Sequence, residues 1–133
     1  MKDLEKLCAE YLWYHPRLSI PEKVWGMCAQ ESQELMDFLK SEFISCHLLH
    51  CWKNRIERPR LYNPLSTLIP SGEWEHWVVC VTTGIPRVLD PTARQFDHTH
   101  PPIRIMTLGD LQREWLYYRK YKEEKEVREV NYK

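Results

Sequence analysis

Cys28 stands at a position where a thiol can act as a nucleophile. The segment Trp25-Gly26-Met27-Cys28-Ala29-Gln30 places this cysteine where a loop passes into an expected helix. Unpaired backbone N–H groups and the positive end of the helix macrodipole favour a thiolate at such a junction. Taken alone, a cysteine is more often a small buried hydrophobe. The position therefore suggests nucleophilic chemistry only if the chain also supplies a base.

His76 and Asp90 supply the remaining parts of such a site. His76 lies 48 residues after Cys28 and opens an expected strand, and Asp90 closes the next expected strand 14 residues later. An antiparallel pairing across Gly84 brings the two side chains alongside each other. Pro91 restrains the backbone of Asp90 toward extended geometry. Thiolate, imidazole and carboxylate together make a Cys-His-Asp triad, in which the carboxylate fixes the imidazole.

Two short motifs carry a resemblance to a known family. His76-Trp77-Val78-Val79 is followed by Val88-Leu89-Asp90-Pro91-Thr92, and Cys28 precedes both at the start of a helix. This order resembles the transglutaminase-like core of the papain-fold cysteine enzymes, over roughly residues 25–96. The resemblance implies a papain-like α+β domain with N-terminal helices packed on a small antiparallel sheet. It implies that Cys28 attacks an amide or ester carbonyl, His76 moves the proton and Asp90 holds the imidazole.

The resemblance also implies an acyl-enzyme that water or an amine resolves. The expected function is thus peptidase, glutamine deamidase or transglutaminase activity on a protein or peptide substrate, without a cofactor. No Gln or Asn precedes Cys28. The backbone N–H of Cys28 then provides one oxyanion donor, and the indole of Trp25 or Trp13 is a candidate for the second. Trp77, beside His76, is a candidate for the substrate cleft. The alternative is a catalytically inactive papain-fold interaction module.

Hydrophobic periodicity predicts the elements that position these residues. An amphipathic helix ends at His15-Pro16, and a second, longer helix starts near Cys28. The apolar side of the first helix is formed by Leu4, Leu7, Cys8, Tyr11 and Leu12. Residues 42–52 are expected to form a strand, although their length also permits a helix. Residues 54–72 are expected to form a long surface connection, 76–83 and 87–90 a hairpin, and 103–106 a further strand. Thr107 with Asp110 predicts a helix through Trp115 and Leu116. We expect one domain over residues 1–118 and a charged tail over 119–133.

A metal site is the main competing interpretation. Residues 46–51, Cys-His-Leu-Leu-His-Cys, and the later His98 and His100 offer soft ligands. On a strand, however, Cys46 and His50 face one side while His47 and Cys51 face the other. We therefore expect no metal there.

Other residues are expected to have plain structural roles. Cys8 and Cys80 fall on apolar faces and are expected in the core. Arg55, Arg58 and Arg60 are expected on a solvated face, and Asp97 is a weaker alternative to Asp90.

Composition limits the classes of partner and compartment. The 133 residues carry 19 basic and 19 acidic side chains, so no overall field favours nucleic acid or an anionic membrane. The first residues lack an apolar stretch of the secretory type, and no apolar run is long enough to span a membrane. With five cysteines in no framework spacing, we expect reduced thiols and a cytoplasmic location.

Overall fold

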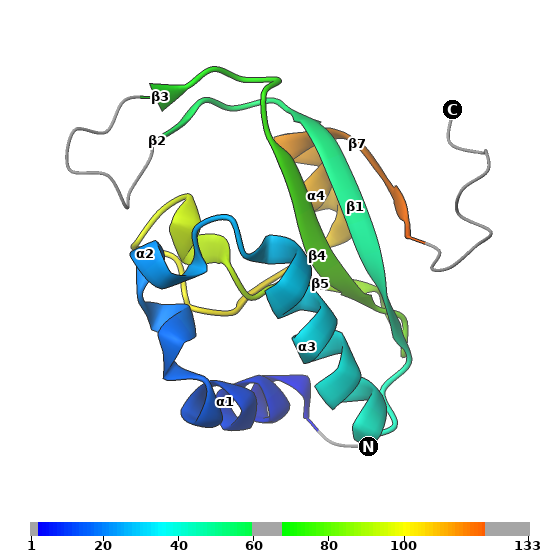
Figure 1. Ribbon diagram of the computed structural model, residues 1–133. Coiled ribbons are helices and arrows are strands. Elements are labelled where there is room, and N and C mark those ends of the chain that lie inside the picture. Colours follow the sequence, from blue (N-terminus) through cyan, green and yellow to red (C-terminus); the bar gives the residue numbers. More distant parts are fainter. Residues whose placement is uncertain (1–2, 60–67, 122–133) are drawn as a thin grey trace.

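A five-stranded antiparallel sheet forms the centre of the computed structural model, which describes residues 3–59 and 68–121 (Figure 1). The strand order is β6-β5-β4-β1-β7. The strands are β1 (Cys46–Asn54), β4 (Glu75–Val81), β5 (Arg87–Asp90), β6 (Arg104–Met106) and β7 (Trp115–Lys120). The expected α+β class, with N-terminal helices on an antiparallel sheet, is confirmed.

The expected hairpin joins β4 to β5. Gly84 in its turn has a φ of 76°, a left-handed conformation that glycine adopts without a steric penalty. The register pairs Val79 with Leu89 and Val81 with Arg87, so the ladder between the two strands stops before Trp77. The edge of β4 that faces β5 is therefore unpaired at Trp77, and it remains available to the helix that carries Cys28.

Four helical segments precede the sheet. Helix α1 (Leu4–Tyr14) begins at the N-cap Asp3, whose carboxylate accepts a hydrogen bond from the N–H of Glu5, and it ends where expected, before Pro16. The connection to the next long helix contains a 3-10 turn η1 (Pro16–Ser19) and a short α2 (Pro21–Val24). Helix α3 (Cys28–Ser41) confirms the long helix that was expected to start near Cys28.

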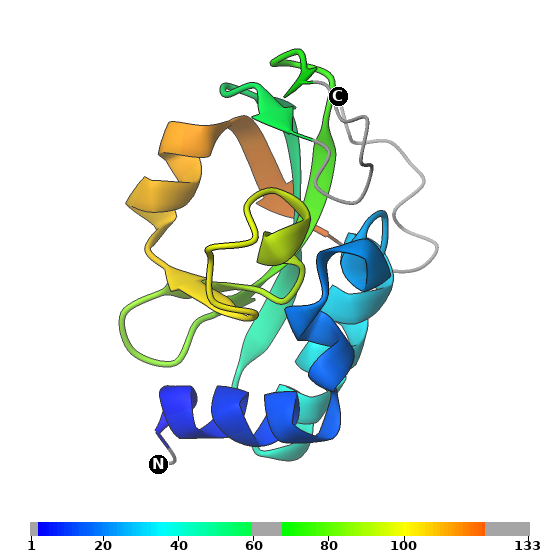
Figure 2. The ribbon, with the colours of Figure 1, turned by 90° about the vertical axis from the view of Figure 1, so that its left-hand side faces the viewer.

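The sheet separates two apolar clusters, and Figure 2 shows helices on both of its sides. Helices α1 and α3 bury Leu7 and Leu35 with Leu48, Val79 and other residues of one face. Helix α4 (Leu108–Glu114) packs Leu111 on the other face. Its N-cap is the expected capping box of Thr107 and Asp110. Both sheet faces are thus covered, which fixes the strands against one another.

Two expected boundaries are wrong. Helix α4 ends at Glu114, because Trp115 and Leu116 enter β7, which pairs with β1. The strand expected from residue 42 begins only at Cys46. The residues between Ser41, where α3 ends, and Cys46 form the Schellman motif that closes the helix. In that motif the N–H of Ile44 bonds to the carbonyl of Leu39, and Phe43 takes a φ of 64°.

The connection expected over residues 54–72 is more structured than predicted. Asn54 is buried at the end of β1, and β2 (Arg58–Pro59) pairs with β3 (Leu68–Ile69) in a small second sheet. The prediction that Arg58 is solvated is wrong, because its guanidinium is buried and donates to Glu114 Oε1 at 3.0 Å. Arg60 and most of the expected charged tail lie outside the described residues.

Strand β7 runs to Lys120, two residues past the expected end of the domain at 118. No helix in the described part of the chain is long and apolar enough to cross a membrane.

Candidate functional site

Cys28 is held in place by the loop before it and by an ion pair behind it. Gly26 has a φ of 74°, and its N–H donates to the side-chain carbonyl of Gln95 at 3.2 Å. Three residues after Cys28, the buried Glu31 accepts two hydrogen bonds from Arg17 of η1, at 2.6 and 2.7 Å. These contacts fix both ends of the first turn of α3 relative to the rest of the domain.

His76 and Asp90 form a buried hydrogen-bonded pair. Nε2 of His76 lies 2.8 Å from Oδ2 of Asp90, and the two residues are only 1% and 3% exposed. The other carboxylate oxygen of Asp90 accepts from the N–H of Thr92 at 3.0 Å. Asp97 instead accepts from the N–H of Thr99, so the structure selects Asp90 over Asp97 as the partner of the imidazole.

The second ring nitrogen of His76 faces the remaining member of the predicted triad. Nδ1 is buried and makes no hydrogen bond of standard geometry to any residue in the described ranges. Cys28 nevertheless lies close enough for hydrogen bonding with His76 to lower the pKa of its thiol. A looser thiol–imidazole contact is common in sites without substrate. The structure thus brings Cys28, His76 and Asp90 together, with the imidazole between the other two.

The backbone of Trp77 docks α3 against β4. Its N–H lies near enough to the Cys28 sulfur to lower the pKa of that thiol, and its carbonyl accepts from Ser32 Oγ at 3.0 Å. Ser32 lies one turn after Cys28 on α3, so both contacts come from the start of the same helix. The part of β4 that β5 leaves unpaired therefore receives the N-terminus of α3, which is what sets Cys28 beside His76.

Cys28 differs electrostatically from the other four cysteines. Burial by itself raises the pKa of the Cys28 thiol, but the hydrogen bond and charge of His76, together with the N–H of Trp77, outweigh burial and lower the pKa. Burial raises the pKa of Cys8 to about 12 and of Cys46 to about 11, and it also raises the pKa values of Cys51 and Cys80. Cys28 is therefore the one thiol of the five that the protein favours as a thiolate.

The charges of the other two residues complement a thiolate. Burial lowers the pKa of His76, but the charge and hydrogen bond of Asp90, supported by Cys28, raise it to about 10. Burial raises the pKa of Asp90, but the charge and hydrogen bond of His76, with the N–H of Thr92, bring it below its usual value. These shifts favour an imidazolium that lies between the carboxylate of Asp90 and the most readily ionised thiol of the protein.

Aromatic rings enclose the imidazole. The ring of His76 stacks on Trp115 at 5.5 Å and meets the edge of Phe96 at 4.7 Å between ring centroids. Arg58 lies 4.7 Å over the Phe96 ring. The sequence reasoning assigned no role to Phe96. The surrounding rings exclude water from one side of the triad and strengthen the charge interactions inside it.

Of the two tryptophans predicted as oxyanion donors, Trp25 lies near the aromatic residues around His76 and Trp13 does not. Trp25 packs edge-on against Trp74 at 4.9 Å, and Trp74 in turn packs against Phe96 beside His76. Trp13 lies on α1 with 78% of its surface exposed, and it lines a separate pocket with Leu12 and Pro16. That position argues against Trp13 as an oxyanion donor to Cys28.

Trp77 and Trp74 differ in what they can offer the site. Trp77 contacts the Cys28 sulfur through its backbone, as described above, whereas its ring packs on His50 and Tyr121. The indole nitrogen of Trp74 is buried without a hydrogen-bond partner among the described residues, and it joins Trp25 as a donor candidate.

Gln95 is the main residue that the sequence reasoning did not assign. Its side chain is buried, accepts from Gly26 N–H, and donates to Thr92 Oγ1 at 2.8 Å. Through Thr92 it reaches the carboxylate of Asp90. Its contact with Gly26 could not be predicted from the sequence, because the two residues are 69 positions apart in the chain. Only its position five residues after Asp90 hinted at a place near the triad. Gln95 thus ties the loop before Cys28 to the acidic end of the triad.

The cysteine and histidine side chains of β1 lie on both faces of the sheet, as predicted from their alternation along a strand. Cys46 lies in the apolar cluster beneath α3, whereas Cys51 lies in the cluster with α4. His50 bonds to Glu75 at 3.0 Å. Among residues 3–59 and 68–121, no group of three or more His, Cys, Asp or Glu side chains is placed to hold a metal ion.

Comparison of the chain with protein-family models, with curated proteins and with solved structures found no match. The geometry of the site and the chemistry of its side chains therefore carry the functional argument.

Proposed function

We propose that this protein is a cysteine-dependent acyl-transfer enzyme of papain-like, transglutaminase-like architecture. Cys28 is the nucleophile, His76 the proton carrier and Asp90 the residue that orients the imidazole. The observation that carries the proposal is the contrast among the five thiols. The one whose pKa is lowered is also the one at a helix N-terminus beside a buried His–Asp pair.

The proposed chemistry follows from the favoured protonation state. The Cys28 thiolate attacks an amide carbonyl carbon, forming a C–S bond and moving the carbonyl electrons onto oxygen. His76 donates its proton to the leaving nitrogen as the C–N bond breaks, which leaves a thioester. Water or an amine then attacks the thioester, His76 accepts the proton, and the C–S bond breaks to restore the thiolate. Asp90 keeps Nε2 protonated throughout, so that Nδ1 serves Cys28.

The oxyanion of the tetrahedral intermediate needs donors. The N–H of Cys28, at the first position of α3, has no partner within the helix because of its place in the helical pattern. An indole N–H from Trp25 or Trp74 is the candidate for the second donor. Loss of one such donor costs about 3 kcal/mol of transition-state stabilisation. The substrate class we propose is a protein or peptide amide, which allows peptidase, glutamine deamidase or transglutaminase activity.

A catalytically inactive interaction module of the same architecture is the second candidate. The near-complete burial of His76 and Asp90 favours it, because a buried ion pair also arises as a structural element. In that case the three residues act in packing, and no covalent intermediate forms.

Detection of an acyl-enzyme separates the two candidates. The protein is incubated with glutamine-containing peptides and an amine acceptor, and intact-mass spectrometry with peptide mapping follows acyl groups on cysteine. We expect a transient acyl adduct on Cys28 and amide turnover, both absent in a folded Cys28→Ala variant. Cys80→Ala, which removes a buried thiol of raised pKa, is the control and should retain both. If Cys28→Ala keeps full biological function, the enzyme reading is rejected and the interaction module is supported.

A further inference from the structure

One stripe of helix α3 runs from the proposed nucleophile toward a pair of lysines. Ala29, Gln33, Met36 and Lys40 follow one another at intervals of four, three and four residues, which places them on one side of the helix. Ala29 and Gln33 line a pocket of about 160 Å3, and Met36 and Lys40 line a neighbouring pocket of about 330 Å3. The helix therefore provides one continuous wall for both pockets.

The opposite wall is also shared. Leu48 of β1 and Tyr121, just after β7, line both pockets, which makes them two sections of one groove beside α3. The N–H of Tyr121 bonds to the carbonyl of Leu48 at 3.0 Å, so this wall is held by the sheet. We call these two pockets together the α3 groove.

One end of the α3 groove lies at the proposed reaction centre. Ala29 directly follows Cys28, and Trp77, which lines the same pocket, contacts the Cys28 sulfur through its backbone N–H. A chain that entered this end of the groove would approach the start of α3, where Cys28 lies. Cys28, His76 and Asp90 line neither pocket, so the near end adjoins the triad through Ala29 and Trp77.

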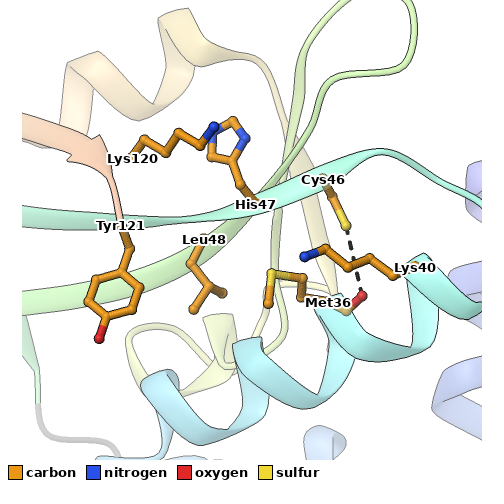
Figure 3. A pocket seen from close by; sticks show the side chains of 7 residues that line it. All are labelled: Met36, Lys40, Cys46, His47, Leu48, Lys120 and Tyr121. Atoms are coloured by element: carbon orange, nitrogen blue, oxygen red, sulfur yellow. Dashed lines mark hydrogen bonds between the residues drawn. The ribbon is translucent and has the colours of Figure 1, made fainter. Parts of the chain in front are cut away.

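The other end of the α3 groove is positively charged. Lys40 of α3 and Lys120 of β7 both line it, and Figure 3 shows them on either side of β1. Both are exposed, and neither forms an ion pair with a described residue. Burial lowers the pKa of His47 in the same pocket, and the positive charges of Lys120 and Lys40 lower it further. Lys120 and His47 lie on one side of β1 and Lys40 on the other, and all three line this end of the groove (Figure 3).

Asp37, an acidic residue near these lysines in the described part of the chain, does not pair with either of them. Asp37 lies on α3 close to Cys46, but its carboxylate accepts a hydrogen bond from Gln33 rather than from a lysine. Two lysines that have no carboxylate partner among residues 3–59 and 68–121, beside a pocket, favour an anionic ligand group. The length of the groove then limits what that ligand is.

At 1.5 Å per residue, the helix from Ala29 to Lys40 spans about 17 Å. An extended peptide rises about 3.3 Å per residue, so roughly five residues cover that length. We propose that the α3 groove binds an acidic peptide segment of the substrate, with the reacting amide at Cys28 and an acidic side chain about five residues away at Lys40 and Lys120. The placement of the reacting amide at the Cys28 end rests on the proposed function, but binding of the peptide itself requires no catalysis.

Peptide binding to a Cys28→Ala variant tests the proposal without turnover. The probes are fluorescein-labelled Gly/Ser peptides with one Gln and a Glu-Glu pair centred five residues from it, on the N-terminal side in one and on the C-terminal side in the other. Each has a neutral counterpart with Ser-Ser in place of Glu-Glu. Fluorescence anisotropy at low ionic strength gives the Kd values, because salt screens exposed charges.

We expect one acidic peptide to bind about tenfold more tightly than its neutral counterpart, as two exposed ion pairs allow. Lys40→Gln/Lys120→Gln in the same background should remove that preference. Lys6→Gln/Lys23→Gln, which removes two exposed lysines from α1 and α2, is the matched control and should retain it. Circular dichroism verifies that the variants fold.

Equal binding of acidic and neutral peptides overturns the proposal, and so does a preference that survives Lys40→Gln/Lys120→Gln. Self-association that depends on these lysines would assign the groove to a second copy of the chain and also overturn it. The acyl-enzyme assay is independent. Acylation of Cys28 without an acidic preference rejects only the groove, whereas an acidic preference without acylation supports the groove and rejects the enzyme.

Discussion

Asp90→Asn changes one atom of the site and has a defined consequence, because both carboxylate oxygens act as acceptors. Oδ2 accepts from Nε2 of His76, and Oδ1 accepts from the N–H of Thr92. An asparagine offers one acceptor and one NH2 group. If its oxygen faces Thr92, its NH2 group opposes the proton on Nε2. If its oxygen faces His76, the N–H of Thr92 is left unsatisfied. Either orientation disfavours the imidazolium or strains its support.

The expected size follows from those contacts. A buried donor left without its acceptor costs about 1–3 kcal/mol, and 1.36 kcal/mol corresponds to a tenfold change in a protonation equilibrium. The charge of Asp90 itself raises the pKa of Cys28, so its loss offsets part of that cost. The direct 2.8 Å contact with His76 is the larger effect. We expect the thiolate fraction of Cys28 at pH 6 to fall about tenfold.

Iodoacetamide alkylation measures that fraction, because only the thiolate reacts. Native protein and Asp90→Asn are alkylated at pH 6 and pH 10, and the rate at Cys28 is read by peptide mapping. The rates should differ about tenfold at pH 6 and approach each other as the pH rises and more of the thiol ionises in both proteins. Asp97→Asn, which removes a carboxylate bonded to Thr99, should match the native protein. Equal native and Asp90→Asn rates at pH 6, or an equal loss in Asp97→Asn, would refute the reasoning.

Three further predictions concern the parts that position the site. Arg17→Ala leaves the buried carboxylate of Glu31 unpaired and should lower the free energy of unfolding by about 3 kcal/mol in urea titration, and a loss under 1 kcal/mol would show that the pair is not needed. Gln95→Ala should slow Cys28 alkylation at pH 6 severalfold, and a native pH–rate profile would show that Gln95 only packs. Phe43→Gly should raise the free energy of unfolding by about 0.5–1 kcal/mol, because a glycine adopts the left-handed conformation at this helix end without strain; a lower value would contradict this account of the helix end.

The parts of the fold that the sequence predicted depend on local signals. The helix starting at Cys28 and the hairpin that joins β4 to β5 are marked by turn residues and by hydrophobic periodicity within a few residues of each boundary. The pairing of His76 with Asp90 followed, because 14 residues across one tight turn leave few alternatives. Short-range patterns were therefore sufficient for two members of the candidate triad.

The parts that were missed depend on long-range contacts. Trp115 was placed in a helix because its near neighbours favour one, but its pairing with Asn54 across the sheet overrides that preference. Arg58 was expected in solvent, but Glu114, 56 residues later, gives it a buried partner. Neither partner is visible in a local window of sequence.

The pH dependence of Cys28 alkylation in the native and the unfolded protein tests the central claim most directly. In urea, Cys28 should react with a midpoint near the value of a free cysteine, about 8.5. In the native protein, His76 lowers the pKa of Cys28, so the midpoint of the rate should lie below the unfolded one. The four other cysteines, with raised pKa values, should react slowly in the native protein. A native midpoint at or above the unfolded one would contradict an activated nucleophile at Cys28.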